Sequence, residues 1–424
     1  MNTKPLSFCL IVILILVISG CTQKENIPSS TPSSTSESTP GESQEIVLGA
    51  MFPLTGDGAA YGEPLSQQLM LSVDEINAAG GIQGKKIKLV LEDSKCTPKD
   101  GSNAANKLVN VDKVKVIFGG ACSGETLGAA PIAEQNHVII ISPAATSPDL
   151  TKAGDYIFRT APSDAYAGKV AAEKALALGF KKAAIINENT DYAQGLRKVF
   201  DKVFTDKGGV VASKESYNPE ETDFKTQILK IKEAKPDVIY VVPQTPAKGV
   251  LLVKQLKEQG VSQQLITAEV LIGRDVVKEH GKDIEGLIGV EAAFNEKGAL
   301  AAKTLDSFRA KHGEPPWPFY QAATRDAVYL IADAIRDHGL DSDEIKKALY
   351  ATKDWEGAIG KLTIDENGDP ILGYSIKQVK NSGLIELSPG VEAVKPTLPP
   401  LDENDPAASK TPPGDGKDVV VESK

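Results

Sequence analysis

The sequence contains few of the residues that most often carry chemistry in proteins. Its 424 residues include only four histidines, four cysteines and two tryptophans. The histidines are scattered, at His137, His280, His312 and His338, and no metal-ligand spacing or nucleophile–base pattern surrounds them. The chain also lacks a G-x-S-x-G elbow and a G-x-G-x-x-G loop after a predicted strand. We therefore predict that the protein is not an enzyme and uses no metal and no cofactor.

The sequence also has fewer positively than negatively charged residues. The chain has 47 Lys and Arg residues against 57 Asp and Glu residues, a net charge of −10. Such a balance argues against nucleic acid as a partner and against electrostatic adhesion to anionic lipid. Because single hydrophobic cores stop growing at about 250–300 residues, a chain of this length predicts two core-forming units.

No hydrophobic run is long enough for a comfortable membrane span. The longest, residues 6–18, is shorter than the ~20 residues that a transmembrane helix needs. It follows Lys4 and ends at Ile18-Ser19-Gly20-Cys21, which resembles a lipobox. We predict that residues 1–20 are a lipoprotein signal peptide and that Cys21 is lipidated; the alternative is an uncleaved anchor with an incidental cysteine. Either reading places the body of the protein outside the cytoplasm. With Cys21 lipidated, we expect the protein to be anchored by lipid to the outer face of the cell membrane or to lie in the periplasm.

Both ends of the chain are poor in apolar residues. Residues 21–44 are rich in Ser, Thr and Pro, and residues 391–424 combine prolines with scattered charges. Segments of this kind cannot bury enough apolar surface to offset the entropy of ordering. We predict a flexible tether at 21–44 and a disordered polar tail at 391–424.

Two cysteines remain after the signal peptide and the lipidation site are set aside. In an oxidising compartment we expect Cys96 and Cys122 to form a disulfide. A two-cysteine metal site is the alternative, but it lacks nearby histidine partners.

Between residues 45 and 390, short β-branched runs alternate with longer amphipathic stretches, which predicts parallel sheets with helices on both faces. The predicted strands are Ile46–Met51, Ile87–Glu92, Val114–Phe118, Val138–Ile141, Ala183–Asn187, Val210–Ser216, Val238–Val242, Leu265–Thr267 and Leu287–Val290. The predicted helices are Glu63–Ala79, Asp164–Leu178, Asp191–Lys207, Thr245–Gln259 and Tyr320–His338. The series restarts near residue 164, so we expect two α/β lobes.

Three loops follow predicted strands, where open α/β sheets bind ligands. The first, residues 119–124, leads into a helix and carries Ser123; free helix N–H groups there would bind an anion, although Ser123 as a simple helix cap is the reading that the local sequence favours. The second, residues 142–148, offers hydroxyls and carbonyls or is a plain turn. In the third, Glu269 is a carboxylate at a strand end that could equally be solvated.

Several motifs resemble the periplasmic leucine/isoleucine/valine-binding proteins of ABC transporters. They are Ile46-Val47-Leu48-Gly49, Pro53-Leu54-Thr55-Gly56 with Tyr61-Gly62, Ile76-Asn77-Ala78-Ala79-Gly80-Gly81-Ile82, the pair Cys96 and Cys122, Ser142-Pro143-Ala144-Ala145-Thr146, and Asp365-Glu366-Asn367-Gly368-Asp369. The resemblance covers residues 45–388.

The resemblance implies a periplasmic binding protein type I fold of the Venus-flytrap kind. In this fold two doubly wound parallel-sheet α/β lobes are joined by three hinge crossings and close on a ligand. The crossings are expected near residues 161–165, 291–295 and 371–375. Lobe one would then comprise 45–163 with 293–372, and lobe two 164–292 with 373–390.

The resemblance also assigns ligand contacts. Ser123 and Thr146, with their backbone amides, would hold an α-carboxylate, and Ala145 is a further expected ligand contact. The Ala144 carbonyl, the Thr146 hydroxyl and the Glu269 carboxylate would hold an ammonium. Two tyrosines, Tyr61 and Tyr192, would wall the side-chain pocket. One departure is Gln244, which stands where leucine-binding members place a tyrosine and leaves room for a more polar ligand.

The function that this resemblance implies is the extracytoplasmic solute-binding component of an ABC importer, a monomer that captures a branched-chain-type amino acid and delivers it to the permease subunits. Alternatives are a binding protein of the same fold for another small ligand (an amide, urea or an aromatic acid) and a sensory ligand-binding protein. A zwitterion needs Glu269 as well as Ser123 and Thr146, whereas urea or an acid does not.

Overall fold

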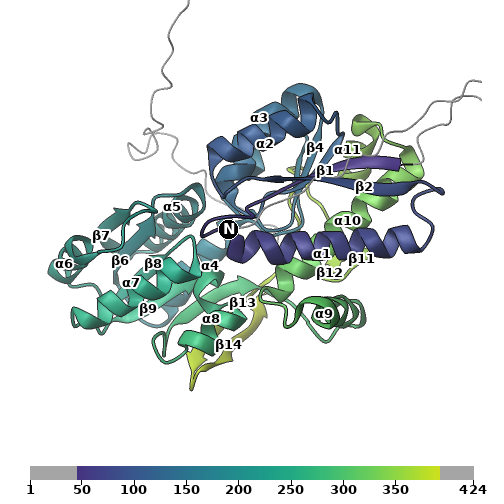
Figure 1. Ribbon diagram of the computed structural model, residues 1–424. Helices are drawn as coiled ribbons and strands as arrows, with labels where there is room; N and C mark the ends of the chain where they lie inside the picture. Colours follow the sequence, from purple (N-terminus) through teal and green to yellow (C-terminus); the bar gives the residue numbers. More distant parts are fainter. Residues whose placement is uncertain (1–44, 392–424) are drawn as a thin grey trace, which may run out of the picture. The chain divides into compact units, whose positions relative to one another are not determined.

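The computed structural model describes residues 45–391, which form two α/β lobes, each built on its own sheet (Figure 1). The predicted signal peptide, the lipidation site Cys21 and the tether therefore lie outside the described residues, as does the predicted tail beyond Val391. Val391 itself belongs to the last strand, one residue inside the range predicted as tail. No helix within 45–391 is both long and apolar enough to cross a membrane.

Lobe one contains a five-stranded sheet in which all pairs are parallel. The strand order is β2-β1-β3-β4-β5. The strands are β1 (Glu45–Phe52), β2 (Lys86–Asp93), β3 (Val116–Gly119), β4 (Ile139–Ser142) and β5 (Ile157–Arg159). Strands β3 and β4 are buried along their whole length, which explains their continuous apolar sequences.

Helices cover both faces of this sheet. One core packs the sheet against α1 (Ala59–Ala78), α10 (Pro318–His338) and α11 (Ser342–Tyr350). A second core packs the other face against α2 (Pro98–Asn110) and α3 (Ser123–Asn136), which lie side by side in Figure 1. Because α10 and α11 come late in the chain, lobe one is completed only after lobe two has been built.

Lobe two contains a seven-stranded sheet in the order β14-β13-β10-β9-β8-β6-β7. The parallel strands are β6 (Lys182–Glu188), β7 (Val210–Tyr217), β8 (Val238–Val242), β9 (Gln264–Ala268) and β10 (Ile288–Ala292). One face carries α4 (Asp164–Ala177) and α5 (Asp191–Asp206). The other carries α6 (Lys225–Ala234), α7 (Pro246–Glu258) and α8 (Arg274–His280).

The last two strands of lobe two differ from the rest of the sheet. Strands β13 (Tyr374–Lys380) and β14 (Gly383–Val391) form a hairpin, and both β10–β13 and β13–β14 are antiparallel. A tight connection at residues 381–382 cannot join parallel strands, so an antiparallel pair follows from the chain's geometry. The expected all-parallel sheet is thus corrected at this edge.

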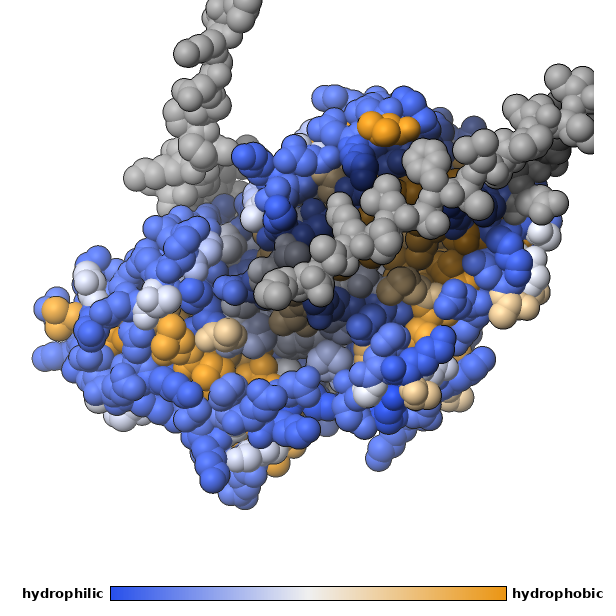
Figure 2. Space-filling view, in the orientation of Figure 1, coloured by the Kyte–Doolittle hydropathy of each residue, from blue (hydrophilic) through white to orange (hydrophobic). Residues whose placement is uncertain are grey.

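The remaining elements are short or lie at the periphery. They are η1 (Pro148–Lys152), η2 (Glu269–Ile272), α9 (Ala299–His312), β11 (Trp355–Gly357) and β12 (Gly360–Leu362). Figure 2 shows a mostly hydrophilic face with separate groups of hydrophobic residues over both lobes, in keeping with the chain's net charge of −10.

The chain passes between the lobes three times: after β5, after β10 and before β13. Hydrogen bonds tie these crossings together, since the Tyr374 hydroxyl donates to the Ser163 carbonyl (2.9 Å) and the Ala293 N–H donates to the Gly373 carbonyl (2.8 Å). The expected flytrap topology with three hinge crossings is confirmed.

Cys96 and Cys122 form the predicted disulfide, closing a separation of 26 residues between the end of β2 and the start of α3. Next to it, the buried Glu125 carboxylate accepts hydrogen bonds from the Ser94 hydroxyl (2.7 Å) and from the N–H groups of Cys96 (3.0 Å) and Cys122 (2.9 Å). Burial raises the pKa of Glu125 to about 7 despite these donors.

Replacing both cysteines with serine should lower the free energy of unfolding by about 3 kcal/mol, because a cross-link over a loop of this size restricts the unfolded chain. Thermal or urea unfolding of the chain lacking residues 1–44 measures this. A reductant should shift the melting temperature of the native chain and leave that of the double variant unchanged. Equal stability of the two proteins would contradict the prediction.

Candidate ligand-binding site

Residues from loops of both lobes line one pocket of about 30 Å³, which we call the first pocket. It contains seven of the eight residues that the sequence predicted as ligand contacts: Tyr61, Ser123, Ala144, Thr146, Tyr192, Gln244 and Glu269. Three further lining residues, Ala121, Val270 and Tyr320, were not predicted. The roles of these residues in ligand binding are predictions from the resemblance.

The lobe-one wall begins with the N-terminus of α3. Ser123 is the first residue of this helix, and Cys122 is its N-cap. The reading of Ser123 as the helix cap was therefore wrong: Glu125 at the third helical position accepts from the Cys122 N–H and does part of the capping. The Ser123 hydroxyl instead accepts from the Ser147 N–H (3.1 Å), which fixes the second loop against the helix. Free N–H groups in the first turn make this wall suited to an anion.

Thr146 follows β4, and its hydroxyl donates to the Asp164 carboxylate (2.7 Å), while the Asp164 N–H donates to the Thr146 carbonyl (2.8 Å). A hydroxyl has one proton, so a hydroxyl that donates to Asp164 can only accept from a ligand. Asp164 thus orients Thr146 as an acceptor. Burial and the neighbouring Glu269 raise the pKa of the Asp164 carboxyl.

Of the second loop, only Ala144 and Thr146 reach the first pocket. Ala145 is fully buried in the core of lobe one, and its N–H donates to the Ser142 hydroxyl (2.8 Å). Ala145 therefore does not line the first pocket: its methyl group is buried in the core and its N–H is bonded to Ser142.

The lobe-two wall carries the charge of the site. Glu269 follows β9 at the first position of η2, and the Tyr192 hydroxyl donates to its Oε1 (3.1 Å). Tyr320, from lobe one, donates a second hydroxyl hydrogen bond. Burial raises the pKa of Glu269, partly offset by its hydrogen bonds. Within residues 45–391 no ion pair involves this carboxylate, so its partners are the two tyrosine hydroxyls and its own backbone N–H, and none of them is a cation.

Tyr61 and Gln244 meet across the two lobes. The Tyr61 hydroxyl donates to the Gln244 carbonyl (3.0 Å), and the Gln244 N–H donates to the Glu188 carboxylate (2.8 Å). The contact with Tyr61 uses the main chain of Gln244. Gln244 is also one of the residues that line the first pocket.

Trp317 adds a contact between the lobes that the sequence did not predict. Its indole lies 5.0 Å from the Tyr61 ring, centroid to centroid, and its Nε1–H donates to the Ala60 carbonyl (3.0 Å). Its six-membered ring also lies over Gly273 of lobe two, where an added Cβ would come within 2.4 Å of the ring. Gly273 therefore forms a notch for Trp317 when the lobes are together.

Sequence reasoning missed Tyr320, Trp317 and Asp164. Tyr320 and Asp164 stand at the first positions of predicted helices, which is where binding residues often occur. Trp317 and Tyr320, however, reach the site only because residues after 293 return to lobe one. No local pattern in the sequence indicates that the chain returns to lobe one.

The pocket therefore has two chemically distinct walls. Lobe one presents helix N–H groups at Ser123, and lobe two presents the carboxylate of Glu269. Such a site can hold a small molecule with an anionic end and a cationic end. Among residues 45–391, no group of three or more His, Cys, Asp or Glu side chains is placed to hold a metal ion.

Comparisons with known proteins agree with this geometry. Residues 45–383 match the model of a family described as periplasmic binding protein. The chain is 32% identical over 336 residues to Leu/Ile/Val-binding protein homolog 1 of Brucella abortus, an alignment that covers 78% of this chain and 89% of the relative.

Solved structures are similar over nearly the whole described region. A leucine-binding protein of Thermotoga maritima has a TM-score of 0.75 at 26% identity, covering 82% of this chain and 99% of its own. A branched-chain amino acid transporter substrate-binding protein of Streptococcus pneumoniae, in complex with isoleucine, has a TM-score of 0.71 at 30% identity, covering 81% and 99%. A solute-binding protein of Rhodopseudomonas palustris, in complex with 3,4-dihydroxybenzoic acid, has a TM-score of 0.73 at 25% identity, covering 83% and 98%.

The Gly273 notch predicts that Gly273→Ala opposes closure of the lobes, because the new methyl group overlaps the Trp317 ring. Overpacking of this kind costs about 1–3 kcal/mol, which is roughly a fivefold to hundredfold loss of ligand affinity. Small-angle X-ray scattering should show a larger radius of gyration than that of the native chain.

Gly298→Ala provides a matched control. Gly298 and Gly273 are both helix N-caps with similar backbone angles (φ −57° for each), but a Cβ at Gly298 meets no atom closer than 3.2 Å. Equal effects of the two substitutions would show that the loss comes from the helix cap and not from the notch.

Proposed function

Because the chain belongs to the periplasmic binding protein family, we propose that it captures a branched-chain-type amino acid between its two lobes and delivers it to the permease of an ABC importer. The relatives named for leucine, isoleucine and valine support this ligand class. The family is extracytoplasmic, and the Cys21 lipid anchor is part of the proposal.

The observation that carries the proposal is the opposition of Glu269 to the N-terminus of α3. The helix N–H groups and Ser123 would bind the α-carboxylate of the amino acid. The Ala144 carbonyl, the acceptor face of Thr146 and Glu269 would bind its ammonium. Each charge-assisted hydrogen bond of this kind contributes about 1.5–3 kcal/mol.

Closure follows from where these groups lie. Ser123 and Thr146 belong to lobe one and Glu269 to lobe two, so a zwitterion contacts both sets only when the lobes are together. A ligand shifts an equilibrium by its difference in affinity for the two states, and this ligand gains its ammonium–Glu269 contact only in the closed state. The closed, loaded form is the one that the permease would receive.

An aromatic acid is the second ligand class, because one similar solved structure is a complex with 3,4-dihydroxybenzoic acid. Glu269 argues against it, because an ionised carboxylate in the pocket repels the carboxylate of the acid, and the Tyr192 and Tyr320 hydroxyls already donate to Glu269. Gln244 leaves room for amino acids more polar than leucine.

Calorimetric titration of the ligand-free chain lacking residues 1–44 against the twenty amino acids, urea, short amides and benzoate tests the proposal. We expect binding of leucine, isoleucine or valine, and at least a hundredfold loss of affinity in Glu269→Ala, because the ammonium would then be buried without its counter-charge.

Glu279→Ala, an exposed glutamate on α8, is the control and should bind the amino acid like the native chain. If no amino acid binds and an amide or an acid does, the proposed ligand class is wrong. Full affinity in Glu269→Ala would overturn the role of Glu269.

A pH dependence follows from the raised pKa values of Glu269 and Asp164. An ammonium binds the carboxylate form of Glu269 and lowers its pKa, so binding should release protons at pH values just above the ordinary carboxyl range. Affinity should rise with pH through that range and become constant above it. Titrations in two buffers of different ionisation enthalpy count the protons released.

Asp164→Asn removes one of the two buried carboxyls with raised pKa values, so the pH dependence of affinity that remains should be that of Glu269. It keeps an oxygen that can accept from Thr146. A profile that is flat from about pH 5 to 8 in both proteins would show that Glu269 is already ionised before the ligand arrives.

A further inference from the structure

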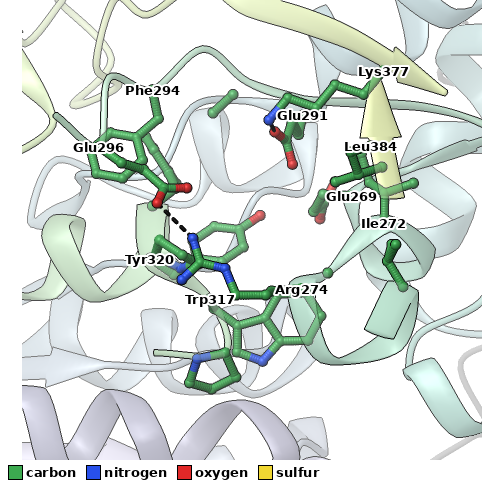
Figure 3. A pocket seen from close by; sticks show the side chains of 16 residues that line it. Glu269, Ile272, Arg274, Glu291, Phe294, Glu296, Trp317, Tyr320, Lys377 and Leu384 are labelled. Carbon is green, nitrogen blue, oxygen red and sulfur yellow. Dashed lines mark hydrogen bonds and ion pairs between the residues drawn. The ribbon is translucent and has the colours of Figure 1, made fainter. Parts of the chain in front are cut away.

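A larger cavity, of about 260 Å³, lies beside the first pocket and shares Glu269 and Tyr320 with it. We call it the second cavity. Both lobes line it: lobe two contributes residues of η2, α8, β10, β13 and β14, and lobe one contributes Phe294, Glu296 and the start of α10. In Figure 3 the Glu269 carboxylate and the Tyr320 hydroxyl both point into it. Of the residues that the sequence predicted as ligand contacts, only Glu269 lines it.

The charged side chains around the second cavity neutralise one another. Glu291 pairs with Lys377, and Arg274 pairs with Glu296 (2.6 Å), the pair marked by the dashed line in Figure 3. Of the carboxylates that line it, Glu269 alone has no cationic partner within residues 45–391. When an amino-acid ammonium occupies Glu269 from the first pocket, the second cavity is left without net charge, which favours an uncharged occupant.

The walls of the second cavity are rich in aromatic rings. Phe294, Phe319 and Tyr320 form a row of edge-to-face contacts, with centroid distances of 5.8 and 5.3 Å, and Trp317 stands beside them. Aromatic rings attract a further ring in edge-to-face or offset geometry. A cavity of about 150 Å³ with apolar walls is enough to hold benzene, so this one has room for a single substituted ring.

We propose that the second cavity binds a small, uncharged aromatic molecule that carries a hydroxyl group, of the phenol type, and that this molecule strengthens amino-acid binding. Its ring packs against Phe294, Trp317 and Tyr320, and its O–H donates to Glu269 or to the Tyr320 hydroxyl. Because both lobes line the cavity, the occupant stabilises the same closed state as the amino acid, and the two ligands are positively coupled.

Titration of phenol into the full chain, with and without saturating leucine, tests the proposal. Phenol should bind, and it should raise the affinity for leucine at least fivefold, with the reciprocal effect of leucine on phenol. Benzoate should not occupy this cavity, because its carboxylate would face Glu269 and Glu291. Benzylammonium should compete with leucine for Glu269 and lower its affinity.

Ala292 lines the second cavity and not the first pocket, so Ala292→Leu should fill the space and abolish phenol binding while leucine affinity stays within twofold. The neighbouring Ala293 lines neither space, and Ala293→Leu is the matched control that should keep both ligands. Thermal unfolding of both variants verifies that they fold.

Absence of phenol binding to the native chain, or binding that is unaffected by Ala292→Leu, would overturn this inference while leaving the amino-acid proposal intact. Absence of leucine binding would instead overturn the proposed function, and phenol binding would still be measured on its own. Competition between phenol and leucine would show that phenol occupies the first pocket, which also overturns the inference.

Discussion

The arrangement of the site depends on one carboxylate, Glu269, that has hydrogen-bond donors but no cation as partners within the described residues. Burying a carboxylate away from water is costly, and the tyrosine hydroxyls of Tyr192 and Tyr320 offset only part of that cost. One of these hydroxyls comes from each lobe. The Glu269 carboxylate therefore lacks a cationic partner at the place where the two lobes meet. A ligand that carries a cationic group can supply this partner.

Contacts within lobe one hold the wall of the first pocket that lies opposite Glu269 in a fixed position. The disulfide between Cys96 and Cys122 and the buried Glu125 hold the start of α3 in place. Asp164 fixes the Thr146 hydroxyl and stands at the first crossing between the lobes. The buried ion pair of Arg159 with Asp369 (2.6 Å) then joins the end of β5 to the late turn before the third crossing. The binding groups are thus attached to the hinge itself.

The sequence predicted the family, the fold and most of the strands, because buried parallel strands have continuous apolar sequences and glycines end the helices between them. The family prediction is confirmed by the family match and by the relatives. Strand β8 coincides with its prediction, Val238–Val242. The β13–β14 hairpin was not predicted as antiparallel, since its strands lie at a sheet edge where pairing depends on the preceding chain path.

At the site, the structure brings together the predicted residues from loops at strand ends, whereas the residues that the sequence did not predict come from distant segments. Ser123, Thr146 and Glu269 follow strands whose positions the sequence fixes, so topology alone brings them to one edge. Trp317 and Tyr320 reach the pocket through the return of the chain to lobe one. The Gly273 notch exists only between folded lobes. Ala145 was misplaced because the direction of one side chain in a turn is set by its hydrogen bond to Ser142.

The contacts between the lobes also bear on release. In the structure the closed arrangement is held by the Tyr61–Gln244 and Tyr320–Glu269 hydrogen bonds, the Trp317 notch at Gly273 and the ion pair of Arg274 in lobe two with Glu296 in lobe one. A net hydrogen bond contributes only about 1 kcal/mol and a partly exposed ion pair about 0–1 kcal/mol, so these contacts alone favour closure weakly. Weak closure of the empty protein suits a transport role, because the permease has to reopen the lobes. The free energy for reopening comes from the contacts between the permease and the binding protein. Under the proposed function, strong closure is reserved for the loaded state, in which the two charges of the amino acid would contact the α3 N-terminus and Glu269.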